Sequence, residues 1–163
     1  MINLMARIGN RCRFTLEKYL LKLRYGRKIN IGKVFWRPRF SVVIDNGQIE
    51  IGDFCFFNFD CSITSLGYIK IGNHNLFGEN VKIYDHNHRF YLRNEYISKQ
   101  GMSVGKVVIG SNCWIGSNVV ILNNTIIGDN CVIGAGCIVS GKIPNGTILK
   151  ASGNYTFEDI RYR

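Results

Sequence analysis

Between residues 109 and 139 an aliphatic side chain recurs at every sixth position, at Ile109, Ile115, Ile121, Ile127, Ile133 and Val139. Glycine directly follows four of these residues, and a small or slim residue stands four positions after each of the first five. A period of six fits neither the 3.6-residue period of an α-helix nor the two-residue alternation of an isolated strand. It is typical of a parallel β-helix, in which each hexad forms one short strand and one corner.

A looser form of the repeat covers residues 29–88, with two extra residues expected near Gly67. Its guide positions are Ile31, Val43, Ile51, Phe57, Ile63, Ile71, Phe77 and Ile83. Residues 89–108 are polar and aperiodic, which predicts a loop extruded from a regular scaffold, and such loops are usually functional. We therefore predict an all-β domain of about five coils over residues 29–144, with the loop at 89–108 and a tail at 145–163.

The N-terminal segment, residues 1–28, carries a different pattern. Apolar residues over positions 2–25 follow helical spacing on one face, and basic residues, among them Arg7, Arg11, Lys18 and Lys22, fall on another. The apolar face consists of Met5, Ile8, Cys12, Leu16, Tyr19, Leu20 and Leu23. This pattern predicts an amphipathic helix that caps the open first coil of the solenoid. Its basic surface suits an anionic lipid or an anionic substrate, and this role is compatible with capping.

The positive charge of the chain is concentrated at one end. The formal net charge is +10; residues 1–39 hold eleven Lys/Arg and one acidic residue, and the remaining 124 residues hold ten of each sign. No aromatic platform or known motif accompanies the charge, so nucleic-acid binding is not expected. No apolar run approaches the roughly 18 residues of a membrane span, and the N-terminus lacks a signal-peptide pattern. A cytoplasmic protein is therefore expected.

Cysteines and histidines supply the candidate chemistry. Five of the six cysteines, Cys55, Cys61, Cys113, Cys131 and Cys137, occupy the slim position of a hexad, which predicts small buried hydrophobes instead of disulfides or metal ligands. The three histidines are His74, His86 and His88. Their separations of 12 and 2 do not suit the three-histidine metal site of a γ-class carbonic anhydrase, so no metal is expected. His86 and His88 directly precede the loop, where an imidazole is a natural general base.

These residues together resemble a family, the hexapeptide-repeat acyltransferases, and within it the galactoside and maltose O-acetyltransferase group. The resemblance covers about residues 51–154 and implies a left-handed β-helix. In that family the catalytic histidine ends a hexad before a protruding loop, and an active-site asparagine lies 30 residues earlier. His88 and Asn58 match this spacing, which favours His88 over His86 as the base. Asn58 and Asp60 are implied to bind the acceptor, and Asp85 is expected to bind it or to orient a histidine.

The same resemblance implies an acetyl-CoA groove along the C-terminal coils. Asn112-Cys113-Trp114-Ile115-Gly116 and Ile133-Gly134-Ala135-Gly136 match two of the family's stretches. Trp114 would line the groove, although a large apolar plug at the solenoid edge is its alternative role. The Ser117 N–H would meet the thioester carbonyl, Ala135 the pantetheine arm and Ser140 the far end of CoA.

Two departures from the family pattern affect the adenine end of that groove. The family's lysine after the serine is Gly141 here, so we expect the phosphate contact to shift to Lys142. The usual Ala-Gly-Asn-Pro-Ala ending is replaced by residues 152–156, Ser-Gly-Asn-Tyr-Thr. Lys150, Arg161 or Arg163 is expected to supply the missing contacts.

The function implied is acetyl-CoA-dependent O-acetylation of a sugar hydroxyl in cell-surface polysaccharide synthesis, such as capsule, O-antigen or exopolysaccharide. The family assembles as homotrimers with active sites between subunits. The basic N-terminal end suits a nucleotide-linked or lipid-linked acceptor at the inner face of the membrane. Two alternatives stay open: N-acetylation of a nucleotide-linked amino sugar, and an inactive β-helix that serves as a scaffold or binding protein.

Overall fold

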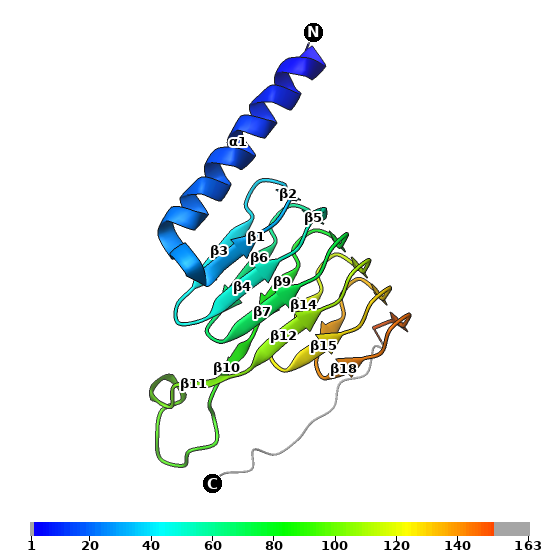
Figure 1. The fold of residues 1–163 in the computed structure, drawn as a ribbon. Helices are drawn as coiled ribbons and strands as arrows, with labels where there is room; N and C mark the ends of the chain where they lie inside the picture. The colour runs from blue at the N-terminus through cyan, green and yellow to red at the C-terminus, as the bar shows by residue number, and fades with distance from the viewer. Residues whose placement is uncertain (1, 152–163) are drawn as a thin grey trace.

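Short parallel strands wind around a single core and stack into three sheets, with one long helix at the N-terminal end (Figure 1). The computed structural model describes residues 2–151, with side chains described from residue 14. The predicted left-handed parallel β-helix is confirmed. Each coil passes through the three sheets in turn, and we name the turns that follow them the first, second and third corners.

The strands divide among the sheets in chain order. The first sheet contains β1 (Ile29–Ile31), β4 (Gln48–Ile51), β7 (Tyr68–Ile71), β12 (Lys106–Ile109), β15 (Thr125–Ile127) and β18 (Lys142–Ile143). The second contains β2 (Val34–Trp36), β5 (Cys55–Phe57), β8 (Leu76–Phe77), β13 (Trp114–Ile115), β16 (Val132–Ile133) and β19 (Ile148–Leu149). The third contains β3 (Ser41–Ile44), β6 (Ser62–Ser65), β9 (Lys82–Tyr84), β14 (Val120–Ile121) and β17 (Ile138–Val139).

The register of the sheets matches the sequence period. Val107 pairs with Thr125, so one late coil holds 18 residues, or three hexads. Ile49 pairs with Ile69, so an early coil holds 20 residues, and the turn at Gly67 takes up the two extra ones. Paired strands continue to Leu149, because β19 pairs with β16. The solenoid thus extends five residues past the predicted boundary at 144.

Asparagine forms many of the corners. Asn112, Asn118, Asn124 and Asn130 recur at six-residue intervals, each with φ between 57° and 59°. Asparagine tolerates this left-handed conformation better than other residues with a side chain. Each of these four residues directly precedes the slim residue of its hexad, so the chain turns just before it re-enters the core.

The core is a stack of the predicted aliphatic positions. All six residues from Ile109 to Val139 are at most 1% exposed, and Phe57 stacks on Phe77 with ring centroids 4.2 Å apart. One guide position was wrong. Val43 is 45% exposed, whereas Val42 and Ile44 on either side are buried, because side chains alternate along β3.

The five hexad cysteines are buried free thiols, as predicted. The Cys55 and Cys113 thiols each donate to a glycine carbonyl oxygen in the neighbouring coil, at 3.1 Å. Burial raises the pKa of Cys55, Cys61 and Cys113. A buried thiol with a raised pKa yields little thiolate and is a poor nucleophile.

Iodoacetamide at about pH 8 is therefore expected to leave Cys55, Cys61 and Cys113 unmodified in the native protein and to alkylate them in denaturant. Peptide mass spectrometry reads each position separately. Equal alkylation rates with and without denaturant would contradict this burial.

Helix α1 (Ile2–Tyr25) leads through the 3-10 turn η1 (Gly26–Lys28) into β1 and packs on the first coil, although not with the predicted face. Phe14, Leu21 and Tyr25 pack against the core, and the Tyr25 hydroxyl donates to Val42 O at 3.0 Å. The basic side also turns inward, where Lys18 Nζ donates to Gly32 O at 2.6 Å.

The predicted packing face of α1 is instead exposed wherever its side chains are described: Leu16, Tyr19, Leu20 and Leu23 are 50–70% accessible. The helix face that carries Phe14 packs on the solenoid instead, because the Phe14 ring contacts the Trp36 ring edge-on, with ring centroids 5.7 Å apart. Within residues 2–151, no helix combines the length and apolarity needed to cross a bilayer.

Candidate active site

The third corner after β9 holds a buried carboxylate that fixes a histidine. Asp85 is 0% exposed, and its oxygens accept from Ser65 Oγ at 2.6 Å, Leu66 N at 2.8 Å and Gly67 N at 2.9 Å. His86 Nδ1 lies 3.0 Å from Asp85 Oδ1. An ionised carboxylate only accepts, so Nδ1 donates and Nε2 is left as the basic nitrogen. The expectation that Asp85 orients a histidine therefore holds for His86, not for His88.

Asp85→Asn is expected to lower the free energy of unfolding by about 2–4 kcal/mol. An amide keeps only one acceptor oxygen, so its N–H donors face the N–H group of either Leu66 or Gly67, whichever way the amide is turned. Urea denaturation followed by circular dichroism measures the change. The matched control is Asp129→Asn, because the exposed Asp129 Oδ1 accepts from Ser111 N, a bond that asparagine can also form. Equal midpoints for the two variants would contradict the role of Asp85.

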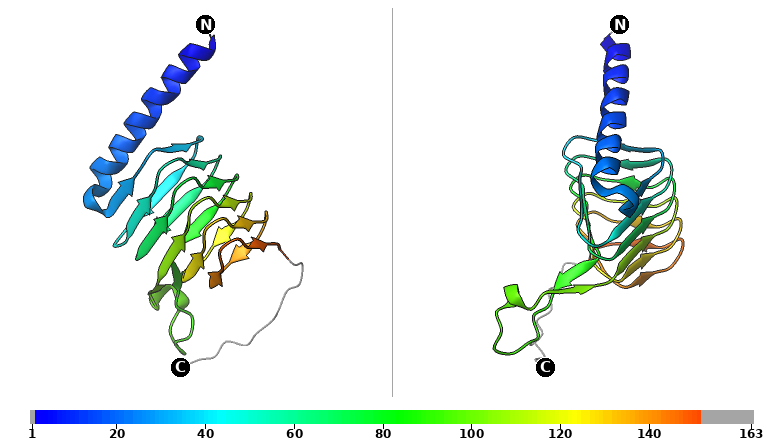
Figure 2. Two further views of the ribbon diagram at one scale, coloured as in Figure 1. Left: turned by 45° about the vertical axis from the view of Figure 1, so that its right-hand side comes forward. Right: turned by 60° about the vertical axis from the view of Figure 1, so that its left-hand side comes forward.

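The loop predicted at 89–108 lies in an ordered antiparallel hairpin that leaves this corner at His86 and returns to it at Gly105, whereas residues 106–108 belong to β12. It consists of β10 (His86–His88), the 3-10 turn η2 (Ile97–Lys99) and β11 (Met102–Val104), and it projects from the side of the solenoid (Figures 1 and 2). Gly105 N donates to Asp85 O at 2.7 Å and closes its base. His88 lies on β10 opposite Met102 and is exposed.

Two amide side chains hold the hairpin in shape. Gln100 is 5% exposed, accepts from Leu92 N at 2.9 Å and donates to Leu92 O and Glu95 O. Asn87 Nδ2 donates to Asn123 Oδ1 at 3.0 Å, which ties the strand of His88 to the following coil. The exposed imidazole of His88 therefore stands on a fixed backbone.

Asn58 and Asp60 lie at the second corner, between β5 and β6. Asn58 Oδ1 accepts from Phe59 N at 3.0 Å. Asp60 forms a bidentate pair with Arg39, with Nη2 2.7 Å from Oδ2, and this bond holds the pKa of Asp60 below its usual range. Asp60 therefore stays a carboxylate that is already partnered, which weakens its predicted role in acceptor binding.

The first corner shows how neighbouring coils normally satisfy their turns. The residue that follows the corner glycine donates its backbone N–H to a side-chain oxygen in the next coil, at 2.7–3.0 Å. The bonds run from Lys33 to Asp53, Asp53 to Asn73, Asn73 to Ser111, Ser111 to Asp129 and Asp129 to Asn145.

The second corner begins the same ladder and then interrupts it. Glu79 N donates to Ser117 Oγ at 3.2 Å, but the residue one coil beyond Ser117 is Ala135, whose methyl group cannot accept. Within the described residues, the N–H groups of Ser117 and Ala135 have no hydrogen-bond acceptor. A ligand at this corner would find two backbone donors on successive coils, about 4.8 Å apart.

The other predicted cofactor residues lie near these donors or on the neighbouring corner. Trp114 is 58% exposed on β13, three residues before Ser117. Exposed Lys150 follows β19 at the second corner, exposed Ser140 lies at the third corner, and exposed Lys142 begins β18. Arg161 and Arg163 lie outside the described residues. In the described part of the chain, no three His, Cys, Asp or Glu side chains form a metal-binding group.

The predicted site residues thus lie at two different corners of the solenoid. Asn58, Ser117 and Ala135 share the second corner, whereas His88 leaves from the third. Strand β6, four residues or about 13 Å long, separates the two corners in a coil. Within one chain, His88 and Asn58 therefore belong to different corners.

Comparison with known proteins gives a family match and several solved relatives. Residues 106–141 match the family described as bacterial transferase hexapeptide (six repeats). An acetyltransferase with hexapeptide repeats from Vibrio cholerae O1 biovar eltor, solved with acetyl-coenzyme A, is 28% identical with a TM-score of 0.68, over 82% of this chain and 71% of that one. No curated protein sequence matches the chain.

Two further solved structures are sugar acetyltransferases by description. A maltose O-acetyltransferase from Clostridium difficile 630 is 32% identical with a TM-score of 0.61, over 73% of this chain and 63% of that one. A galactoside acetyltransferase solved with coenzyme A is 29% identical with a TM-score of 0.63, over 80% and 63%. The chain therefore spans slightly less than two thirds of these two proteins.

Proposed function

We propose that this chain, a hexapeptide-repeat acyltransferase similar to the galactoside and maltose O-acetyltransferases, transfers the acetyl group of acetyl-CoA to a sugar hydroxyl. The observation that carries the proposal is the pair of free N–H groups at Ser117 and Ala135. At the first corner a side chain of the next coil takes the corresponding hydrogen bond in each coil from Lys33 to Asp129. A pantetheine arm offers amide and thioester carbonyls that suit two donors in a row.

The chemistry assigns one task to each group. His88 removes the proton from the acceptor hydroxyl as its oxygen attacks the thioester carbon. The Ser117 N–H donates to the carbonyl oxygen, which becomes negative in the transition state. When the tetrahedral intermediate collapses, the C–S bond breaks, CoA leaves as the thiol after taking the proton from His88, and the acetyl ester remains on the sugar. Asn58 orients the hydroxyl.

The active site is completed between copies of the chain. We assign His88 to one subunit and the Ser117–Ala135 groove with Asn58 to its neighbour, in a homotrimer like those implied by the family resemblance. The separation of the second and third corners in one chain supports this assignment. The hairpin of His88 projects away from its own solenoid, in a position to reach an adjacent subunit.

We assign the acceptor to cell-surface polysaccharide synthesis in the cytoplasm, as a free, nucleotide-linked or lipid-linked sugar. The strongly basic N-terminal segment supports an acceptor that carries phosphate. N-acetylation of an amino sugar would use the same base and groove.

The test is mass spectrometry of products from purified protein, acetyl-CoA and a panel of free, nucleotide-linked and lipid-linked sugars. The expected product is one acetyl group heavier than its acceptor, and hydroxylamine distinguishes an O-acetyl ester, which it cleaves, from an N-acetyl amide. No acetylated product, together with no heat of acetyl-CoA binding in calorimetry, would favour the scaffold function.

A further inference from the structure

From residue 14 on, where its side chains are described, helix α1 has apolar residues on two faces, and the solenoid covers one of them. Phe14, Leu21 and Tyr25 pack on the first coil. Leu16, Tyr19, Leu20 and Leu23 are 58%, 62%, 50% and 70% exposed. Their spacing places them in one continuous stripe along the helix. We call these four residues the outer stripe.

Cations flank the outer stripe. At 100° per residue, Lys22 lies on one side of the stripe and Arg24 on the other, and both are exposed. Arg27 and Lys28 follow in η1. Over residues 1–28 there are eight Lys/Arg and one acidic residue, a net of +7. Figure 2 shows α1 projecting beyond the first coil, so that the solenoid does not shield its outer side.

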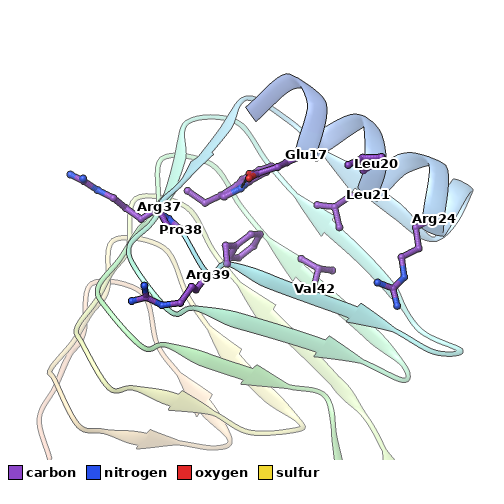
Figure 3. A pocket seen from close by; sticks show the side chains of 10 residues that line it. Glu17, Leu20, Leu21, Arg24, Arg37, Pro38, Arg39 and Val42 are labelled. Atoms are coloured by element: carbon purple, nitrogen blue, oxygen red, sulfur yellow. Dashed lines mark hydrogen bonds between the residues drawn. The ribbon is translucent and has the colours of Figure 1, made fainter. Parts of the chain in front are cut away.

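A pocket of about 290 Å³ continues the outer stripe down to the first coil (Figure 3). Leu20, Leu21, Phe40 and Val42 form its apolar part, and its charged lining residues are Arg24, Arg37, Arg39 and Glu17. Glu17 accepts a hydrogen bond from Trp36 Nε1, so the three arginines favour a ligand with an apolar part and a negative charge.

We propose that the outer stripe and its flanking cations bind the surface of an anionic lipid bilayer, with the pocket receiving part of an acyl chain. Burying apolar side chains at the boundary of headgroups and acyl chains, beside Lys and Arg, is how interfacial helices bind membranes. Cations near such a surface are attracted to it, and salt weakens that attraction. A second copy of the same helix is disfavoured as the occupant, because two segments of net +7 repel. The proposed membrane binding does not depend on the proposed acetyl transfer.

The experiment is co-sedimentation of the full chain with phosphatidylcholine vesicles that contain none or about 30% phosphatidylglycerol. We expect binding only to the anionic vesicles, weakened by salt. Leu16→Ser/Leu20→Ser/Leu23→Ser is expected to reduce binding at least tenfold, on the order of the apolar transfer energy lost. Lys22→Glu/Arg24→Glu is expected to reduce it similarly. The matched control, Val43→Ser, removes an apolar side chain that is 45% exposed on β3 and should bind like the wild type.

Light scattering and acetyl-transfer assays on the same samples make the outcome decisive. Loss of vesicle binding in the stripe variant, with unchanged oligomeric mass and unchanged transfer to a water-soluble acceptor, supports the proposal. Absence of binding by the wild-type protein overturns it. So does a change of oligomeric mass in the stripe variant, which would show that the stripe lies between copies of the chain.

Discussion

His88→Ala is expected to lower kcat for acetyl transfer by about 10²–10⁴-fold while acetyl-CoA binding stays unchanged. The imidazole supplies the base and lies on the hairpin, whereas the proposed donors for CoA lie at the second corner. Since His88 is exposed and packs on no core residue, its loss should not alter stability. Initial rates at saturating acceptor, with calorimetry of acetyl-CoA, separate the two effects.

His86→Ala is the matched comparison, because the structure gives His86 the carboxylate partner that often accompanies a catalytic base. Spacing relative to Asn58 favours His88, whereas the 3.0 Å contact to Asp85 favours His86. We expect His86→Ala to lower the free energy of unfolding and to displace the hairpin. The pH dependence of the rate should change little. If His88→Ala keeps full activity and His86→Ala abolishes the titration of the base, the base is His86.

Ala135→Asn is expected to lower kcat by about 10²–10³-fold, the usual effect of losing an oxyanion donor, and to weaken acetyl-CoA binding. The new side-chain oxygen would accept from Ser117 N, as Asn145 accepts from Asp129 N in the first corner at 2.9 Å. The ladder of the second corner would then be complete, and its donor no longer available to the thioester.

Ala135→Gly is the control, because it provides no acceptor and leaves both N–H groups free. Rate assays and acetyl-CoA calorimetry on the two variants should differ strongly, and Ala135→Gly should resemble the wild type. Equal kinetics for Ala135→Asn and the wild type would show that Ser117 N–H is not the donor.

The solenoid could be predicted because its repeat is strictly local. Each hexad contributes one core aliphatic residue and one slim residue, so the period from Ile109 to Val139 specified strands, corners and the 18-residue coil together. The same regularity placed Ser117 and Ala135 on successive coils. The positions of Trp114 and the buried cysteines followed from the same register.

The features that the sequence did not predict depend on which of several similar residues turns toward the core. Helix α1 has apolar residues on two faces, and contacts such as Phe14 with Trp36 and Tyr25 with Val42 favour the one that packs. Val43 lies in a run of three apolar residues, so the pattern could not specify its direction. Nothing in a polar loop distinguishes Gln100 as its buried centre. The Asp85–His86 contact had a signal, the adjacent residues themselves, but their relative orientation required the corner geometry.

The most direct measurement mixes two inactive variants, His88→Ala and Ala135→Asn, by joint unfolding and refolding. In a statistically mixed trimer, about one quarter of the interfaces pair an intact histidine edge with an intact groove. We predict that acetyl transfer recovers to about a quarter of the wild-type rate, measured by mass spectrometry of the acetylated sugar. Activity no higher than that of the separate variants, in trimers shown to be mixed, would contradict a site completed between subunits.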